Sequence, residues 1–146
     1  MKLALIPLLT GIIAGISMAL QGSLNTLLSK VIGLLEAAFV VHVIGAVALV
    51  ALLLMRLGQG NLAQMGKAPW YAYLGGLLSA VILYTVMASI SKLGVSIATT
   101  AIIVGQVSTA LIIDHFGLFG LKEIPFTWWK VFGVALLATG AKLMLN

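Results

Sequence analysis

The chain has 146 residues, of which 62% are hydrophobic and only 8% are charged. Soluble domains carry about 25% charged residues, so this sequence has too few charges to cover a surface that faces water. It has no cysteine, which excludes disulfide bonds, thiolate metal sites and a cysteine nucleophile. The net charge is +5, but the basic residues form neither a run nor a basic-aromatic face that would bind nucleic acid. These features indicate a protein whose solvent is lipid.

Five long apolar segments are predicted to cross the membrane as helices. A membrane-spanning helix needs roughly 20 apolar residues. The predicted helices cover residues 3–29, 34–57, 69–91, 93–114 and 126–145. About four residues connect the first two, almost none connect the third and fourth, and no connection is long enough for a soluble domain. We therefore predict one all-α integral membrane domain, residues 1–146, in the inner (cytoplasmic) membrane of the cell.

The first two predicted helices carry polar side chains inside apolar sequence. Ser17, Gln21 and Asn25 share one face of the first helix because they are four residues apart. Unpaired amides are costly in hydrocarbon, so this face is either a substrate-binding wall or a set of hydrogen bonds between helices. In the second helix, Glu36 lies in the first turn, where the helix dipole favours an acid. His42 lies on another face and is either a satisfied hydrogen-bond partner or a group for ion coupling.

The third and fourth predicted helices add a second set of candidate polar residues. Tyr84 could lend a ring and a hydroxyl to a cavity, although a buried aromatic more often serves packing. Thr99, Gln106 and Asp114 fall within one arc of the fourth helix at 100° per residue, which predicts a stripe facing the same interior. Asp114 is followed by His115 and the Phe116-Gly117 break, which together predict a fixed helix exit. No second ligand is suitably spaced for a metal site, so none is expected.

The positive residues are divided almost evenly between the two sides of the membrane. With the N-terminus on one side, that side carries Lys2, Arg56, Lys67, Lys122 and Lys130, and the other carries Lys30, Lys92 and Lys142. So weak a bias lets both orientations insert, although ordinary insertion in one orientation is the alternative. Because the predicted helices are odd in number, two opposed copies would form a ten-helix bundle with a two-fold axis in the membrane plane.

An antiparallel pair would also bring two acids together. In one copy Glu36 and Asp114 lie on opposite sides of the membrane, given the predicted helices. With a second copy inverted, Glu36 of one and Asp114 of the other come to the same side. They are therefore candidates for a gate or for ion coupling, together with His42.

Three stretches of sequence carry a family resemblance. The first helix contains GISMALQGSLNTLL with Gln21 and Asn25, the fourth contains LGVSIATTAIIVGQ followed by LIIDHFGLFG, and the fifth contains FGVALLATGAKLM. The whole chain resembles the five-helix, single-domain branch of the drug/metabolite transporter superfamily, which is related to the small multidrug resistance proteins. The Gly105-Gln106 pair and the string 113–117 are its most specific parts.

The resemblance has implications for assembly and for energetics. Members of the branch occur as single genes, adjacent pairs and fused proteins, which implies an antiparallel dimer. Gly133 and Gly140, seven residues apart with Ala141 adjacent, resemble the dimer contact in the last helix of small multidrug resistance proteins, and small residues permit close helix approach in lipid. Those relatives carry a glutamate in helix 1, whereas this region offers Gln21 and Asn25. Their proton-antiport mechanism therefore cannot be copied onto this chain.

The sequence as a whole predicts a transporter and no enzyme. We expect an antiparallel homodimer in the lipid bilayer that carries a small, neutral or weakly charged metabolite or drug-like molecule by alternating access. No cofactor, metal or nucleic-acid partner is expected. A membrane subunit that only packs against a partner, and a passive channel, are the alternatives. The candidate substrate-binding residues are Ser17, Gln21, Asn25, Tyr84, Thr99 and Gln106.

Overall fold

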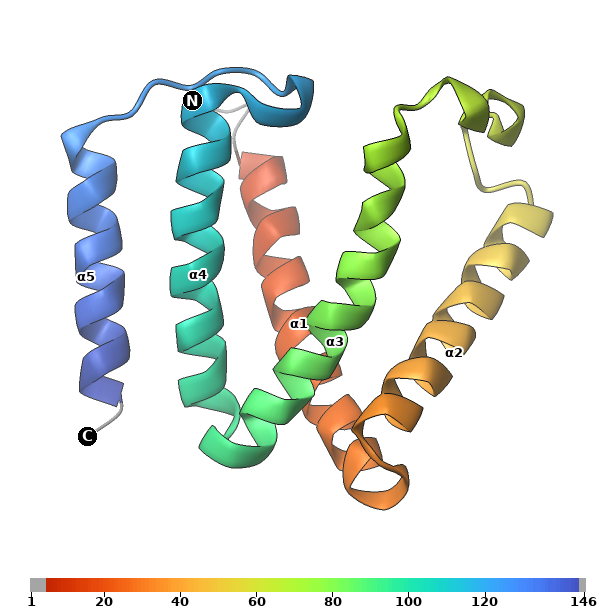
Figure 1. The fold of residues 1–146 in the computed structure, drawn as a ribbon, viewed down its shortest axis with the longest axis horizontal. Coiled ribbons are helices and arrows are strands. Elements are labelled where there is room, and N and C mark those ends of the chain that lie inside the picture. The colour runs from red at the N-terminus through yellow and green to blue at the C-terminus, as the bar shows by residue number, and fades with distance from the viewer. Residues whose placement is uncertain (1–4, 145–146) are drawn as a thin grey trace. The chain divides into compact units, whose positions relative to one another are not determined.

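The computed structural model describes residues 5–144, and all regular structure in this range is helical. Lys2, the first two residues of the predicted helix 3–29 and the last residue of the predicted helix 126–145 lie outside the described residues. The elements in chain order (Figure 1) are α1 (Leu5–Ile32), α2 (Leu34–Leu54), η2 (Leu62–Lys67), η3 (Trp70–Tyr73), α3 (Leu74–Leu93), α4 (Val95–Phe116), η4 (Leu118–Gly120) and α5 (Trp128–Met144).

Four of these helical segments are long and apolar enough to cross a membrane. They are Leu5–Ile32, Leu34–Leu54, Trp70–Leu93 and Val95–Phe116. The all-helical membrane fold is thus confirmed for four spans. Helix α5 has 17 residues, which gives a length of about 26 Å against a hydrocarbon thickness of about 30 Å. Its crossing of the membrane stays a prediction, as does the homodimer.

Single glycines make two of the turns between helices. Only Gly33 separates α1 from α2, with φ 101°, and only Gly94 separates α3 from α4, with φ 81°. A residue without a Cβ adopts these positive φ values readily, so each turn needs one residue. The connection of about four residues predicted after the first helix is therefore wrong, since α1 continues through Lys30 to Ile32.

The segment between α2 and α3 is structured rather than an open loop. Helix α2 ends at Leu54, three residues before the predicted end, and Arg56 follows with a positive φ of 58°. Asn61 caps η2 by accepting a hydrogen bond from the backbone N–H of Ala63 at 2.9 Å. The Tyr73 hydroxyl donates to the carbonyl oxygen of Met65. This segment is thereby tied to the start of α3.

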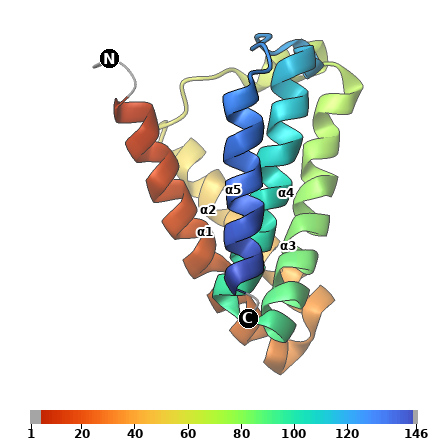
Figure 2. The same ribbon diagram turned by 90° about the vertical axis from the view of Figure 1, so that its left-hand side faces the viewer.

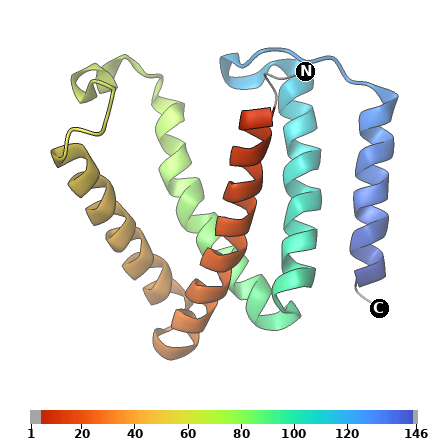
Figure 3. The same cartoon turned by 180° about the vertical axis from the view of Figure 1, so that it is seen from behind.

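The chain divides into two compact units, Met1–Ala88 and Ser89–Asn146. In the first unit α1 and α2 pack against each other. Its core is Ala37, Ala38 and Met87, with the partly buried Leu28, Leu34 and Leu83 packed around it. From this core α2 and α3 diverge, as seen from two sides (Figure 1, Figure 3).

The second unit contains the end of α3, all of α4 and α5, which run side by side (Figure 2). The Thr100 hydroxyl of α4 donates to the Met144 sulfur of α5 at 3.1 Å. Helix α4 ends at Phe116 and is capped by Gly117, which is left-handed with φ 56°. The Ile124 N–H donates to the Asp114 carbonyl oxygen at 2.8 Å. The fixed helix exit predicted at this position is confirmed.

Most apolar side chains of the described helices are not covered by the chain itself. Between 6% and 17% of each candidate span is buried, and large residues such as Ile6, Leu54 and Val31 are more than 70% exposed. Contiguous apolar surface of this extent is a liability in water, whereas a bilayer covers it at no cost. The exposure therefore fits helices that satisfy their own backbone groups in lipid.

Candidate polar pocket in the first unit

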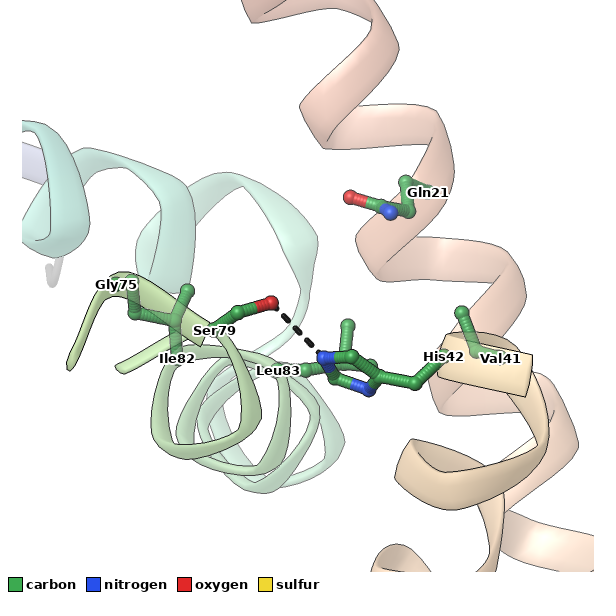
Figure 4. Close-up of a pocket in the computed structure, with 7 residues that line it drawn as sticks. All are labelled: Gln21, Val41, His42, Gly75, Ser79, Ile82 and Leu83. Carbon is green, nitrogen blue, oxygen red and sulfur yellow. Dashed lines mark hydrogen bonds between the residues drawn. The ribbon is translucent and has the colours of Figure 1, made fainter. Parts of the chain in front are cut away.

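A polar pocket of about 290 Å³ lies within the first unit. Gln21 of α1, His42 of α2 and Ser79 of α3 supply its polar side chains, and Val41, Gly75, Ile82 and Leu83 complete the lining (Figure 4). None of the seven lining residues is an acid or a strong base, so the pocket suits an uncharged occupant.

The packing of the helices places the pocket next to the core. His42 is one helical turn after Ala38, and Ser79 is two turns before Met87 on the antiparallel α3, so both stand on the same side of the core. There α2 and α3 diverge (Figure 1). Gly75 adds space, because a Cβ at this position would meet nothing within 4 Å. Small residues and diverging helices together keep the pocket open.

Hydrogen bonds fix the orientation and tautomer of His42. Its Nδ1 lies 2.7 Å from the backbone carbonyl oxygen of Ala38. A carbonyl only accepts, so Nδ1 carries a proton and the neutral ring has its lone pair at Nε2. Nε2 lies 2.8 Å from Ser79 Oγ, so the Ser79 hydroxyl donates to the neutral ring. His42 is thus a hydrogen-bond partner of α3, which was one of its two predicted roles.

Gln21 is the third polar side chain and has a free amide. It extends from α1 toward the α3 side of the pocket (Figure 4). Within the part of the chain that the structure describes, its side chain makes no hydrogen bond. Its oxygen can accept and its NH₂ group can donate, so both are available to a bound molecule.

Asn25 is one turn further along α1 but does not line the pocket. Its side chain is buried, with 6% of the residue exposed, and its Nδ2 has no hydrogen-bond partner. The hydroxyls nearby do not serve as partners between helices, because Ser23, Thr26 and Ser29 donate to backbone carbonyls of α1 at 2.7–2.8 Å. Within this chain, α1 therefore does not use these hydroxyls to bind its neighbours.

The other residues predicted for the first unit lie outside the pocket. Ser17 is exposed and its hydroxyl donates to the carbonyl oxygen of Ile13 at 2.9 Å. Tyr84 is 42% exposed and follows Leu83 without joining the lining. Glu36 is exposed in the first turn of α2, where a Cβ built on Gly33 would come within 2.2 Å of its Oε2.

In the second unit the residues of the predicted polar stripe do not line the apolar pocket described next. Thr99 and Asp114 are half-buried and Gln106 is exposed. The unit has a separate apolar pocket of about 250 Å³ that contains none of them. One wall is aromatic, since the His115 ring meets Phe116 and Phe126 edge-on, with centroids 4.7 and 5.9 Å apart. A cavity shared by the first four helices stays a prediction.

The glycines predicted for the dimer contact face open space. A Cβ at Gly133 or Gly140 would meet nothing within 4 Å, and both residues and Ala141 are half-buried. The dimer contact stays a prediction. Between residues 5 and 144, no three His, Cys, Asp or Glu side chains gather as a metal site would require.

Within the described residues, the apolar helices define a multi-pass, all-helical membrane protein. Residues 6–143 match the model of the family described as "Putative inner membrane exporter, YdcZ". The match covers nearly the whole chain, so this protein belongs to that family, a branch of the drug/metabolite transporter superfamily. It is a multi-pass inner-membrane protein. No curated protein and no solved structure matched the chain.

Sequence reasoning missed Ser79. A lone serine in an apolar run carries no signal of its own, and only the register of α2 against α3 brings it to His42.

Proposed function

We propose that this protein exports a small uncharged molecule by alternating access, and that the Gln21–His42–Ser79 pocket is part of its binding site. The observation that supports the proposal is a polar pocket between otherwise apolar helices. Polar groups inside a membrane domain are costly unless they are paired or wetted. Here Gln21 is unpaired and opens onto space, which fits binding better than static packing.

The proposal includes an antiparallel homodimer. The nearly balanced placement of lysines and arginine supports insertion in both orientations. The exposed apolar faces leave surface for a second copy, and Gly133 and Gly140 offer a place for close approach without a steric conflict inside the chain. Alternating access would then come from rocking of one copy against the other around the binding site.

Export itself is tested with cells that produce or lack the protein. We expect that production raises the extracellular level of at least one small uncharged molecule, measured by untargeted mass spectrometry of the medium. A non-transporting packing subunit predicts no change in any molecule. A passive channel predicts release that stops when inside and outside concentrations are equal, whereas an exporter continues beyond that point.

The arrangement of the dimer is tested by labelling. The sequence has no cysteine, so a single cysteine at Gly60, in the segment between α2 and η2, gives one reporter. With a membrane-impermeant maleimide, antiparallel insertion predicts that about half of the protein is labelled from each side. Labelling from one side only would rule out the antiparallel homodimer and leave export to be judged by the first assay.

The contact between copies is tested at the fifth helix. Gly133→Leu or Gly140→Leu should shift the protein toward monomer in detergent, measured by light scattering, because a bulky side chain blocks close backbone approach. Gly45→Leu is the matched control, since a Cβ at Gly45 also meets open space. An unchanged dimer in both α5 variants would contradict this contact.

A further inference from the structure

We propose that a proton and a hydrogen-bond-donating molecule compete at the His42–Ser79 pair, so that the pocket selects uncharged ligands with an N–H or O–H group. This inference rests on the proposed function and adds both a ligand class and a coupling residue. It starts from the two hydrogen bonds of His42, to Ala38 O at 2.7 Å and to Ser79 Oγ at 2.8 Å.

The neutral ring determines what Ser79 offers to the pocket. Because Nδ1–H is held by the Ala38 carbonyl, Nε2 can only accept, and the Ser79 hydroxyl proton points to it. Both remaining positions on Ser79 Oγ are then lone pairs. In this state Ser79 can accept hydrogen bonds from a ligand and has none to donate.

Protonation of His42 changes the hydrogen-bonding character of Ser79. A proton that binds the Nε2 lone pair makes Nε2–H a donor, and Ser79 Oγ becomes its acceptor. The hydroxyl proton of Ser79 then turns toward the pocket and takes one of the two outward positions. Ser79 Oγ keeps one lone pair, but this oxygen already accepts a hydrogen bond from the positively charged ring of His42. A donating ligand therefore binds the neutral state better, and an accepting ligand gains a partner in the charged state.

No other titratable side chain lines this pocket. On α1 the lining residue is Gln21, and on α3 the lining residues are Gly75, Ser79, Ile82 and Leu83. The remaining charged or titratable groups of these three helices lie outside the lining, namely Lys30 on α1, Glu36 on α2, and Tyr84 and Lys92 on α3. Among the seven lining residues, His42 is therefore the one whose side chain can take up a proton at the Ser79 contact.

Competition of this kind gives an exporter a route to exchange a proton for its substrate. Occupation by a donating ligand favours neutral His42, and arrival of a proton weakens the ligand's hydrogen bond at Ser79. The chain thereby obtains a coupling group without a carboxylate among the pocket residues. The ligand class follows from the same chemistry: small, uncharged and carrying at least one N–H or O–H.

The test compares two uncharged probes that differ in one donor. In purified full-length protein labelled with ¹⁵N-histidine, the pH at which half of His42 is protonated is measured by NMR with 2-pyrrolidone and with 1-methyl-2-pyrrolidone. A ligand that binds only the neutral form, at about tenfold its dissociation constant, lowers that pH by about one unit. We expect 2-pyrrolidone to lower the half-protonation pH of His42 by up to about one unit. We expect 1-methyl-2-pyrrolidone, which has no N–H, not to lower it.

Two variants and one internal standard complete the test. Ser79→Ala should abolish the difference between the probes, whereas Thr85→Val should keep it, because the Thr85 hydroxyl of the same helix donates to the carbonyl oxygen of Val81 at 2.8 Å. His115, the second histidine of the sequence, should respond equally to both probes. The proposal is overturned if 2-pyrrolidone fails to lower the half-protonation pH of His42 or if both probes lower it equally. Export that persists in the cell assay would then show that only the coupling inference had failed.

Discussion

The two units of the chain treat their polar side chains in different ways. In the first unit Asn25, Thr26 and Ser29 are buried, and a histidine and a serine from different helices bond across a polar pocket. In the second unit Gln106 is exposed, and the pocket is lined mainly by apolar and aromatic side chains.

This difference suggests that the two units have different roles, one in binding a ligand and the other in contacting a second copy. The first unit builds a polar site from its own three helices, so its geometry can be tested in a single chain. In the second unit Gln106 is exposed, and a Cβ at Gly133 or Gly140 would meet nothing within 4 Å. We therefore propose that ligand binding belongs mainly to the first unit and contact with a second copy mainly to the second.

The largest effect on stability is expected in the core that supports the pocket. Met87 is fully buried, and truncation of a buried methionine to alanine costs about 2–5 kcal/mol. Met87→Ala should lower the free energy of unfolding by at least about 2 kcal/mol, measured by thermal or denaturant unfolding in detergent. Ile103→Ala in the second unit, where Ile103 is 39% exposed, should cost clearly less. Equal losses would contradict a core concentrated in the first unit.

A smaller effect is expected from the free amide of the pocket. Gln21→Leu removes one hydrogen-bonding group that faces the ligand, which is worth about 1.4 kcal/mol, or tenfold in affinity. The concentration for half-maximal export should therefore rise about tenfold. The matched change in the second unit, Gln106→Leu, should raise it less. If Gln106→Leu has the larger effect, the second unit carries the binding site and the division is wrong.

The smallest effect is expected at the buried, unpaired amide. Asn25→Leu replaces a group that has lost water without gaining a partner at Nδ2, and an apolar group of similar shape should raise the free energy of unfolding by about 1 kcal/mol. Gln21→Leu, which changes an exposed side chain, should leave stability almost unchanged. Destabilisation by Asn25→Leu would mean that the amide has a partner in the dimer.

The sequence predicted the helices far better than it predicted the pocket. Long apolar runs place α2, α3 and α4 within a few residues, because length and hydropathy are local properties. The helix exit near Asp114 was also foreseen, since a glycine after an aromatic is a local signal. The single-residue turn at Gly33 was not, because its φ depends on the approach of two helices.

The partners of the pocket are non-local. Gln21 and His42 were noticed as polar residues in apolar helices, but on separate grounds. The turn at Gly33 brings Gln21 and His42 to the same pocket. The antiparallel course of α3 then places Ser79 Oγ 2.8 Å from His42 Nε2. A helical period assigns a face within one helix and gives no information about the neighbour opposite. For that reason Ser79 could not be found from the sequence, and Tyr84, which the sequence suggests for a cavity, lies outside the pocket lining.

The most direct measurement of the central claim fills the pocket without touching its polar groups. Gly75 lines the pocket and has open space where a Cβ would stand, so Gly75→Leu should occupy the cavity and abolish export while the protein remains folded. Gly45→Leu places the same side chain in open space on α2, outside the pocket, and should export at the normal rate. Undiminished export by Gly75→Leu, at equal protein level in the membrane, would show that the exported molecule does not pass through this pocket.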